Sequence, residues 1–376
     1  MSPTTQLLLE LIACPSVNPA FLPGKNPLAG EARVAELIAG TARQAGLEAE
    51  FQQVFPGRDN VIVRLSPSGN VRSRILLAPH MDTVGVESER QFSPRVFKGR
   101  IYGRGACDTK GSVASMLRAV CELAGSRKRP QNTEIIFAGL VDEENNQSGS
   151  RALGRTGLKA DLAIVGEPTR LRVMTAHKGD LWLQLETRGK AAHGAKPHLG
   201  RNAVHEMARI VDLLETTYAR ELRRQRHPLL GSATINVGSI RGGTQPNIVP
   251  DECVISVDRR TLPGENERTV RREIQKLLAR HQRRARLINS KNSVCPPMET
   301  SVRLPLVQQF LRAAGQKRGC GADFFCDAAI LSDAGIPSVV FGPGDIAQAH
   351  TADEWISSAQ IERATALLTR FLQSLP

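Results

Sequence analysis

Helical and strand-like hydrophobic patterns alternate over residues 30–170, and this alternation limits the possible folds more than any other feature. Amphipathic helical spacing is present at 30–45 and at 111–124. Buried strands are predicted from short aliphatic or β-branched runs at 60–65, 74–78, 134–141 and 162–165. Strands that alternate with helices predict a doubly wound α/β sheet, in which ligands bind beyond the carboxyl ends of the strands.

The pattern changes at about residue 177 and returns after about residue 290. Between these points the spacing predicts strand, helix, strand, strand, helix and strand, at 181–187, 202–218, 233–240, 252–259, 265–279 and 286–289. This βαββαβ order is that of a ferredoxin-like domain. The helix and strand alternation then resumes at 304–318, 328–334, 338–341 and 358–375. We therefore predict one discontinuous α/β domain, residues 1–175 and 291–376, and one inserted domain, residues 176–290.

The composition is that of an ordinary globular protein, with 41% hydrophobic and 23% charged residues. The net charge of +13 is compatible with a nucleic-acid partner. However, many of the excess basic residues lie at 220–226 and 268–286, where they follow helical spacing. A solvated helix face explains that pattern, and only 4% of the residues are aromatic and able to stack on bases. We therefore expect no nucleic-acid partner.

No apolar run approaches the roughly 20 residues that cross a bilayer, so no membrane association is expected. The leucine-rich N-terminus lacks a basic segment, and Glu10 interrupts its apolar run. It predicts a first helix, capped by Thr4 or Thr5 and ending near Pro15, in place of a targeting segment. The seven cysteines are scattered and lack CxxC spacing, which favours a reducing, cytoplasmic compartment over a disulfide scaffold.

Acidic and imidazole side chains follow several of the predicted strands. Asp108 lies in a glycine-rich loop before the helix at 111–124, and the other members of the set are His80, Asp82, Glu143, Glu144, Glu167 and His350. Taken singly, a histidine near a strand end is more often structural, and an aspartate before a helix is more often a cap. Gathered at one edge of a sheet, two histidines and three carboxylates suit two zinc ions that share a bridging carboxylate.

The spacing within this set predicts separate roles. His80 and Asp82 are two residues apart, so they point the same way in an extended segment, and Asp82 can orient an imidazole that holds a metal. If Glu144 is a ligand, its neighbour Glu143 points elsewhere and is free to take a proton from a metal-held water. No catalytic or metal-binding role is assigned to Asp142, which is expected to form a structural hydrogen bond. These roles favour a hydrolase of an amide or ester.

The motifs that contain these residues are, in chain order, APHMDTVG, GRGACDTKGS, VDEENNQSGS, IVGEPT, AAHGAKPHLGRNAV, GGTQPNIVPDECVISVDRRTLPGE, FCDAAILSDAGIPSVVFGPGD and AHTADEW. They resemble those of the acetylornithine deacetylase, succinyl-diaminopimelate desuccinylase and carboxypeptidase G family of dinuclear zinc hydrolases, over nearly the whole chain. The resemblance implies a zinc-peptidase-like doubly wound catalytic domain and an inserted ferredoxin-like domain that serves as a lid and as the contact of a homodimer.

The same resemblance implies a ligand set for two metal ions per chain. His80 and Glu167 are expected to hold one zinc ion, and Glu144 and His350 the other, with Asp108 as the bridge. Co²⁺ is an expected substitute for zinc.

The remaining expected roles concern catalysis and substrate binding. By resemblance, Asp82 supports His80 and Glu143 is the general base. The backbone N–H groups of Gly342 and Gly344, in the sequence GPG, are expected to line the site.

In the inserted domain, the resemblance makes His193 an oxyanion stabiliser that reaches the active site of the partner subunit. It makes Asn247 and Arg260 the residues that grip the carbonyl and the carboxylate of the substrate, for which a planar guanidinium is suited. Arg259 is adjacent, and strand alternation allows only one of the two arginines to face the cleft. We predict that this one is Arg260.

The function predicted from these observations is a zinc-dependent amidohydrolase that removes an N-acyl group from a small amino acid, as acetylornithine deacetylase does. Two alternatives in the same class are a desuccinylase and a metallocarboxypeptidase or dipeptidase acting on small peptides, because the metal site does not encode the acyl group. An alternative of another class is a non-catalytic binding protein that retains the fold. Such a protein should have lost a ligand or the base, and all six residues are present.

Overall fold

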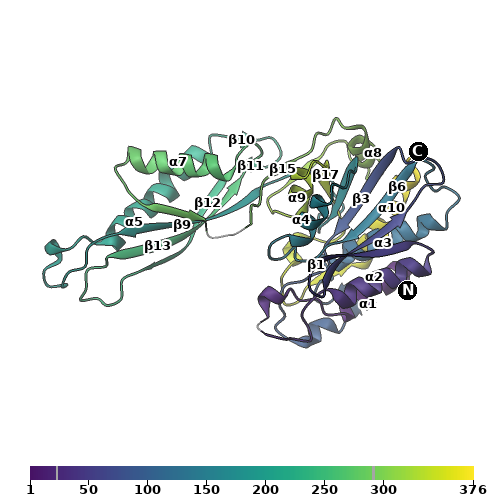
Figure 1. The fold of residues 1–376 in the computed structure, drawn as a ribbon, viewed down its shortest axis with the longest axis horizontal. Helices are drawn as coiled ribbons and strands as arrows, with labels where there is room; N and C mark the ends of the chain where they lie inside the picture. The colour runs from purple at the N-terminus through teal and green to yellow at the C-terminus, as the bar shows by residue number, and fades with distance from the viewer. Residues whose placement is uncertain (23, 290–292) are drawn as a thin grey trace. The chain divides into compact units, whose positions relative to one another are not determined.

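The computed structural model describes residues 1–22, 24–289 and 293–376, and these divide into two compact units (Figure 1). The first unit comprises residues 1–175, 299–320 and 326–376, and the second comprises 176–298 and 321–325. The predicted boundary between residues 290 and 291 lies outside the described residues. The lid and dimerisation roles of the second unit stay predictions.

The large sheet has nine strands and places its parallel strands at the centre. Its order is β1 (Glu48–Phe55), β2 (Arg58–Leu65), β6 (Thr133–Gly139), β3 (Ser73–Pro79), β7 (Leu162–Gly166), β17 (Ser338–Val340), β8 (Met174–His177) and β15 (Met298–Glu299), with β16 (Cys320–Ala322) paired to β8. β6, β3, β7 and β17 run parallel to one another, whereas β2 beside β6 and β8 beside β17 are antiparallel to them. All residues of β6 and β7 are buried, as in a strand covered on both faces.

Helices of the first unit pack around this sheet. One hydrophobic core joins alternate strand residues, such as Ile75 and Leu77, to α1 (Pro3–Ala13), α2 (Ala32–Gln44), α3 (Lys110–Ala124), α8 (Pro305–Ala313) and α10 (Ser358–Gln373). α4 (Ser148–Arg155) packs on α9 (Asp327–Asp333), which contacts β7 and β17. Figure 1 shows the helices beside the twisted sheet. This arrangement is the predicted doubly wound α/β fold.

A small antiparallel sheet also belongs to the first unit. β5 (Arg100–Tyr102) pairs with both β4 (Arg95–Phe97) and β18 (Trp355–Ser357). This pairing ties the segment before α3 to the segment before α10, two stretches that lie about 250 residues apart in the sequence. The pattern of the sequence did not predict it.

The second unit has a four-stranded antiparallel sheet in the order β12 (Thr234–Gly242), β13 (Glu252–Thr261), β9 (Gly179–Arg188) and β14 (Arg286–Asn289). One face is covered by α7 (Glu267–Arg280) and by a continuous helical segment, α5 (Ala203–Asp212), a π-helical turn at 213–218 and α6 (Ala219–Leu222). A short hairpin of β10 (Arg226–His227) and β11 (Gly231–Ser232) follows. The chain order of the main elements is the predicted βαββαβ.

The cap of α1 differs from the sequence expectation. Ser2 caps α1, since its side chain accepts a hydrogen bond from the N–H of Thr5 at 3.1 Å, whereas Thr4 or Thr5 was expected to be the cap. No helix among the described residues has the length and apolar character that a membrane span requires.

Candidate active site

The predicted metal ligands lie beyond the carboxyl ends of four adjacent strands of the large sheet. His80 directly follows β3 and Glu167 directly follows β7, whereas Glu144 and His350 lie in the loops after β6 and β17. Because parallel neighbours end at the same edge, these residues meet there although they are far apart in the chain. Asp108 joins them from the loop between β5 and α3.

The five side chains form one continuous series of contacts. His80 Nε2 lies 3.1 Å from Asp108 Oδ1 and 3.9 Å from Glu167 Oε1. His350 Nε2 lies 3.3 Å from Asp108 Oδ2 and 3.1 Å from Glu144 Oε2. Each carboxylate oxygen of Asp108 therefore faces a different imidazole. That is the arrangement in which one carboxylate could serve two cations.

The donor set fits a metal centre. One ligand atom each from His80, Asp108 and Glu144 lie within 4.8 Å of one another. Glu144 Oε1 is buried and has no hydrogen-bond partner among the described residues, so it is available to a cation. Imidazole nitrogens and carboxylate oxygens are ligands that Zn²⁺ and Co²⁺ accept.

The electrostatics of the site also favour a bound cation. Burial raises the pKa of Glu144 and that of Glu167, and the charge of Asp108 adds to both shifts. Hydrogen bonds to Asp108 and Glu144 raise the pKa of His350 to about 10. Crowded buried carboxylates thus resist ionisation where no cation other than a protonated imidazole balances them.

Asp82 contacts both the His80 ring and the loop that carries the glutamates. His80 Nδ1 lies 3.0 Å from the backbone oxygen of Asp82 and 3.4 Å from its Oδ1. The carboxylate of Asp82 accepts the backbone N–H groups of Glu143, at 3.0 Å, and Glu144, at 3.1 Å. Asp82 therefore lies beside the imidazole that it is predicted to orient, with its backbone oxygen the nearer atom. It also holds the glutamate loop, which the sequence did not indicate.

Glu143 and Glu144 differ in their side-chain contacts. Glu144 meets His350, whereas the carboxylate of Glu143 has no hydrogen-bond partner among the described residues. Burial raises the pKa of Glu143 well above its ordinary value; His80 opposes the shift, and Glu167 adds to it. A buried carboxylate with a raised pKa and a free oxygen is suited to accept and release a proton.

Asp142 has the structural hydrogen bonds expected for it, in a left-handed conformation with φ of 66°. Its carboxylate accepts from Asn18 Nδ2 at 2.9 Å and pairs with Arg58 at 3.3 Å. Arg58 also forms a bidentate pair with buried Glu31, at 2.6 and 2.7 Å. Asn18 donates a second hydrogen bond to Asp82, at 2.8 Å. The sequence did not predict this supporting role for Asn18, Glu31 or Arg58, because no motif contains them.

The sequence of this chain matches Peptidase family M20/M25/M40 over residues 76–374. The protein belongs to this family. It is 32% identical to the acetylornithine deacetylase of Myxococcus xanthus, with 87% of each chain aligned. It is 30% identical to the acetylornithine deacetylase of Edwardsiella ictaluri, over 97% of this chain and 96% of that one.

Solved structures share the fold at lower sequence identity. Aminopeptidase PepT from Bacillus cereus has a TM-score of 0.79 and 22% identity, over 99% of this chain and 97% of the other. An M20 family metallo-carboxypeptidase from Sulfolobus solfataricus has a TM-score of 0.76 and 20% identity, over 99% of both chains. The family and the curated relatives together identify this M20 protein as a metal-dependent hydrolase of amide bonds.

The two predicted substrate residues of the second unit that lie in loops are neighbours. His193 forms a β-bridge with Ile248, and the N–H of Gly194 donates to the backbone oxygen of Asn247 at 2.7 Å. His193 and Asn247 are both exposed. In this M20 hydrolase the two residues therefore lie in adjacent, exposed loops of the second unit.

Arg259 and Arg260 point to opposite faces of β13. Arg259 is fully buried with the residues that face the helices, and it pairs with Glu265 and Tyr218. Arg260 lies on the open face, with 31% of its side chain exposed, 3.0 Å from Asp258 and 3.7 Å from Asp180. Of the two arginines, Arg260 is the one that a ligand can reach.

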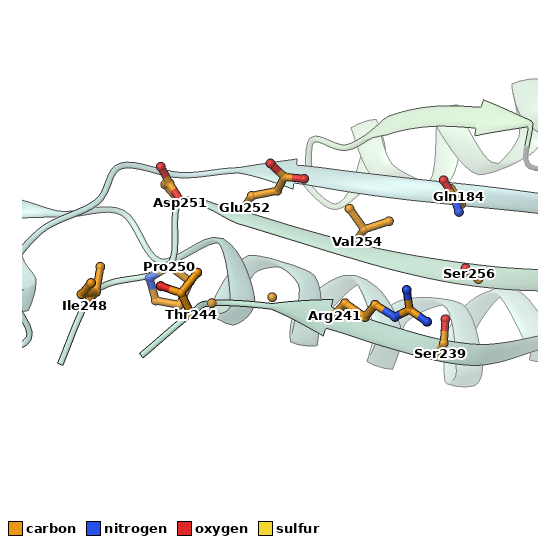
Figure 2. A pocket seen from close by; sticks show the side chains of 12 residues that line it. Gln184, Ser239, Arg241, Thr244, Ile248, Pro250, Asp251, Glu252, Val254 and Ser256 are labelled. Atoms are coloured by element: carbon orange, nitrogen blue, oxygen red, sulfur yellow. The ribbon is translucent and has the colours of Figure 1, made fainter. Parts of the chain in front are cut away.

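The open face of this sheet also carries a cavity of about 670 Å³ (Figure 2). Ile248, next to Asn247 in the chain, lines one end of it, and Figure 2 shows the Arg241 side chain extended beside Ser239. The cavity therefore adjoins the loop that holds a predicted substrate residue.

The N–H groups of Gly342 and Gly344 are occupied, contrary to the expectation that they line the site. Gly342 donates to Thr169 Oγ1 at 3.1 Å, and Gly344 donates to Gln360 Oε1 at 2.9 Å. A Cβ on Gly342 would lie 2.6 Å from the backbone oxygen of Glu167. The lack of a side chain at Gly342 instead allows the chain to pass close to the backbone of Glu167, a predicted metal ligand.

Proposed function

We propose that this M20 hydrolase removes the N-acyl group from a small N-acylated amino acid, with an N-acetylated amino acid such as acetylornithine as the favoured substrate. The observation that carries the proposal is that curated relatives named acetylornithine deacetylase align with 87–97% of the chain. The structures with peptidase titles share 22% identity or less, so they support only the fold.

In the proposed site one continuous donor set would hold two metal ions. His80 and Glu167 would hold the first ion, Glu144 and His350 the second, and Asp108 would be shared between them. Their distances in the structure support this division. When bound, zinc or cobalt would supply the positive charge that polarises the amide carbonyl and lowers the pKa of water to about 7.

Glu143 would move the proton. Its carboxylate is buried and has no hydrogen-bond partner among the described residues, so its oxygens are available to accept a proton from the attacking water. The same group can pass that proton to the departing amine, which completes the hydrolysis. Asp82 would keep Glu143 in place through the backbone N–H group that it accepts.

The second unit would bind and orient the substrate. Asn247 and His193 offer polar side chains from adjacent, exposed loops, and Arg260 offers a guanidinium for the substrate carboxylate. Arg260 is paired with Asp258 in the structure, so a substrate would have to compete with that carboxylate. We further propose that His193 acts on the active site of the partner in a homodimer.

The direct test is a substrate screen with metal-depleted protein that has been reloaded with Zn²⁺ or Co²⁺. N-acetyl-L-ornithine, other N-acetyl amino acids, N-succinyl-diaminopimelate and dipeptides would be compared by the release of primary amine. We expect kcat/KM for the best N-acetyl amino acid to exceed that for the other classes by about tenfold or more. Preference for dipeptides would replace the proposal with a peptidase, and activity that survives chelation would exclude the metal mechanism.

A further inference from the structure

The carboxylate of Glu354 is buried against the loop that carries Asp108. Its Oε1 accepts the backbone N–H groups of Cys107, at 2.8 Å, and Asp108, at 3.0 Å. Its Oε2 accepts the N–H of Gly105, at 3.0 Å, and pairs with buried Arg104, at 2.8 Å. One side chain thus satisfies three N–H groups within four consecutive residues.

The conformation of this loop depends on such an acceptor. Buried N–H groups need a hydrogen-bond partner, and several that converge on one point favour an anion there. Gly105 has φ of 80°, a conformation that side chains rarely adopt, and a Cβ there would lie 2.9 Å from Lys110 Cδ. Without the carboxylate of Glu354, the three N–H groups would lose their acceptor and Arg104 its counter-charge.

Glu354 also belongs to the segment that carries His350, four residues earlier in the chain. The backbone oxygen of Glu354 accepts the N–H of Gly103 at 3.1 Å, and the next residue, Trp355, pairs with Tyr102 where β18 meets β5. Main-chain contacts therefore fix this segment against the strand that leads to the Asp108 loop. The Glu354 carboxylate then holds the loop itself.

We propose that Glu354 is a positioning residue of the metal centre, which sets the Asp108 carboxylate relative to His350 and so determines the affinity for metal. The inference rests on the proposed function, because it takes Asp108 and His350 as metal ligands. The Oδ2 atom of Asp108 and the Nε2 atom of His350 are 3.3 Å apart in the structure. Among the described residues, the Glu354 carboxylate forms no hydrogen bond or ion pair with either imidazole of the cluster.

The test is the metal affinity of Glu354→Gln, measured without substrate. Glutamine keeps the size of the side chain but replaces one acceptor oxygen by an NH₂ group, which must face N–H groups or Arg104. Metal-free protein would be titrated with Zn²⁺, and separately with Co²⁺, in competition with a chromophoric chelator. We expect binding to weaken roughly 10- to 100-fold, the usual effect of losing a group that orients a ligand. Unchanged affinity would overturn the inference.

The second unit offers a matched control. Glu265 pairs with buried Arg259 and accepts the N–H of Leu262 at 2.6 Å, so Glu265→Gln also removes a carboxylate from a buried guanidinium and a backbone donor. It should lower the resistance to urea and leave the metal affinity unchanged. Equal loss of affinity in both variants would show that general destabilisation is the cause and would overturn a positioning role for Glu354.

Glu354→Asp keeps the test decisive if the glutamine variant does not fold. Aspartate retains the charge opposite Arg104 but is one methylene shorter, so it cannot reach all the N–H groups. Its affinity should fall between those of the wild type and the expected glutamine variant, and a wild-type affinity would overturn the inference. If the wild-type chain binds metal but hydrolyses no acylated amino acid, only the proposed substrate is overturned. If it binds no metal, both the proposed function and the role of Glu354 are overturned.

Discussion

Adjacent glutamates at 143 and 144 are distinguished by the groups around them. Asp82 accepts the backbone N–H of both, so one anchor holds the two residues. The side chains then diverge: Glu144 reaches His350, whereas the carboxylate of Glu143, near His80 and Glu167, has no hydrogen-bond partner in the part of the chain that the structure describes. In the proposed mechanism, the same side-chain chemistry would therefore supply a metal ligand at one position and a proton acceptor at the next.

This division predicts different defects for two matching substitutions. Glu143→Gln should lower kcat roughly 10²- to 10⁴-fold, as expected for the loss of a general base, and leave the metal content near that of the wild type. Glu144→Gln should lower the metal content itself, since the amide is a weaker ligand. Steady-state hydrolysis and elemental analysis of the purified variants would measure both effects. The reverse pattern of metal loss would show that the two roles are exchanged.

At the scale of elements, the sequence best predicted the helices and strands whose hydrophobic residues recur with a regular local period. The run around Ile135 and Phe137 predicted β6. The strands predicted before His80 and Glu167 are β3 and β7, so the sequence placed both residues correctly at strand ends. β1 was not predicted. It is an edge strand with exposed and half-buried residues only, so it shows no apolar run.

The supporting groups of the site could not be predicted in this way. Glu354 contacts Asp108 across 246 residues of sequence, and Asn18 contacts Asp142 across 124. Nothing in the sequence near either residue indicates such a partner, because the contact exists only after β18 and the first unit have folded. Motifs therefore pointed to the candidate ligands, and the tertiary structure showed the residues that contact them.

The junction between β8 and β9 contains a buried histidine outside the active site. His177 is fully buried, with Nδ1 2.8 Å from the backbone oxygen of Lys178 and its ring edge-on to Phe325. Nε2 has no hydrogen-bond partner among the described residues. Burial lowers the pKa of His177 to about 4, so the ring is neutral in the folded protein at neutral pH.

This histidine should make the protein less stable in mild acid. The ordinary pKa of histidine is about 6.5, whereas that of folded His177 is about 4. Between these pH values the unfolded chain binds a proton at residue 177 and the folded protein does not, so the free energy of unfolding falls as the pH falls. The shift corresponds to roughly 3 kcal/mol at most. Urea unfolding at pH 7 and pH 5 should show a smaller loss for His177→Asn, which retains a donor for Lys178 and does not titrate. Equal losses would contradict the assignment.

At the scale of the whole molecule, the candidate catalytic groups are divided between the two units. All five proposed metal ligands and Glu143 belong to the first unit, whereas His193, Asn247 and Arg260 belong to the second. The residues of the second unit can act in catalysis only where that unit lies against a metal centre. That unit belongs either to the same chain or to a partner, and the two cases differ in how defects in separate chains combine.

Heterodimers with defined defects separate the two cases. If His193 acts on the partner, a purified heterodimer of His193→Ala and Asp108→Ala chains, selected through two affinity tags, has one intact site and should show about half of the wild-type activity per dimer. A heterodimer of wild-type and doubly substituted chains should then be nearly inactive, because each site lacks one group. If His193 acts within its own chain, the two results exchange, since the doubly substituted heterodimer keeps one complete chain. Initial rates of the two heterodimers, with both singly substituted homodimers as controls, therefore decide which subunit completes the site.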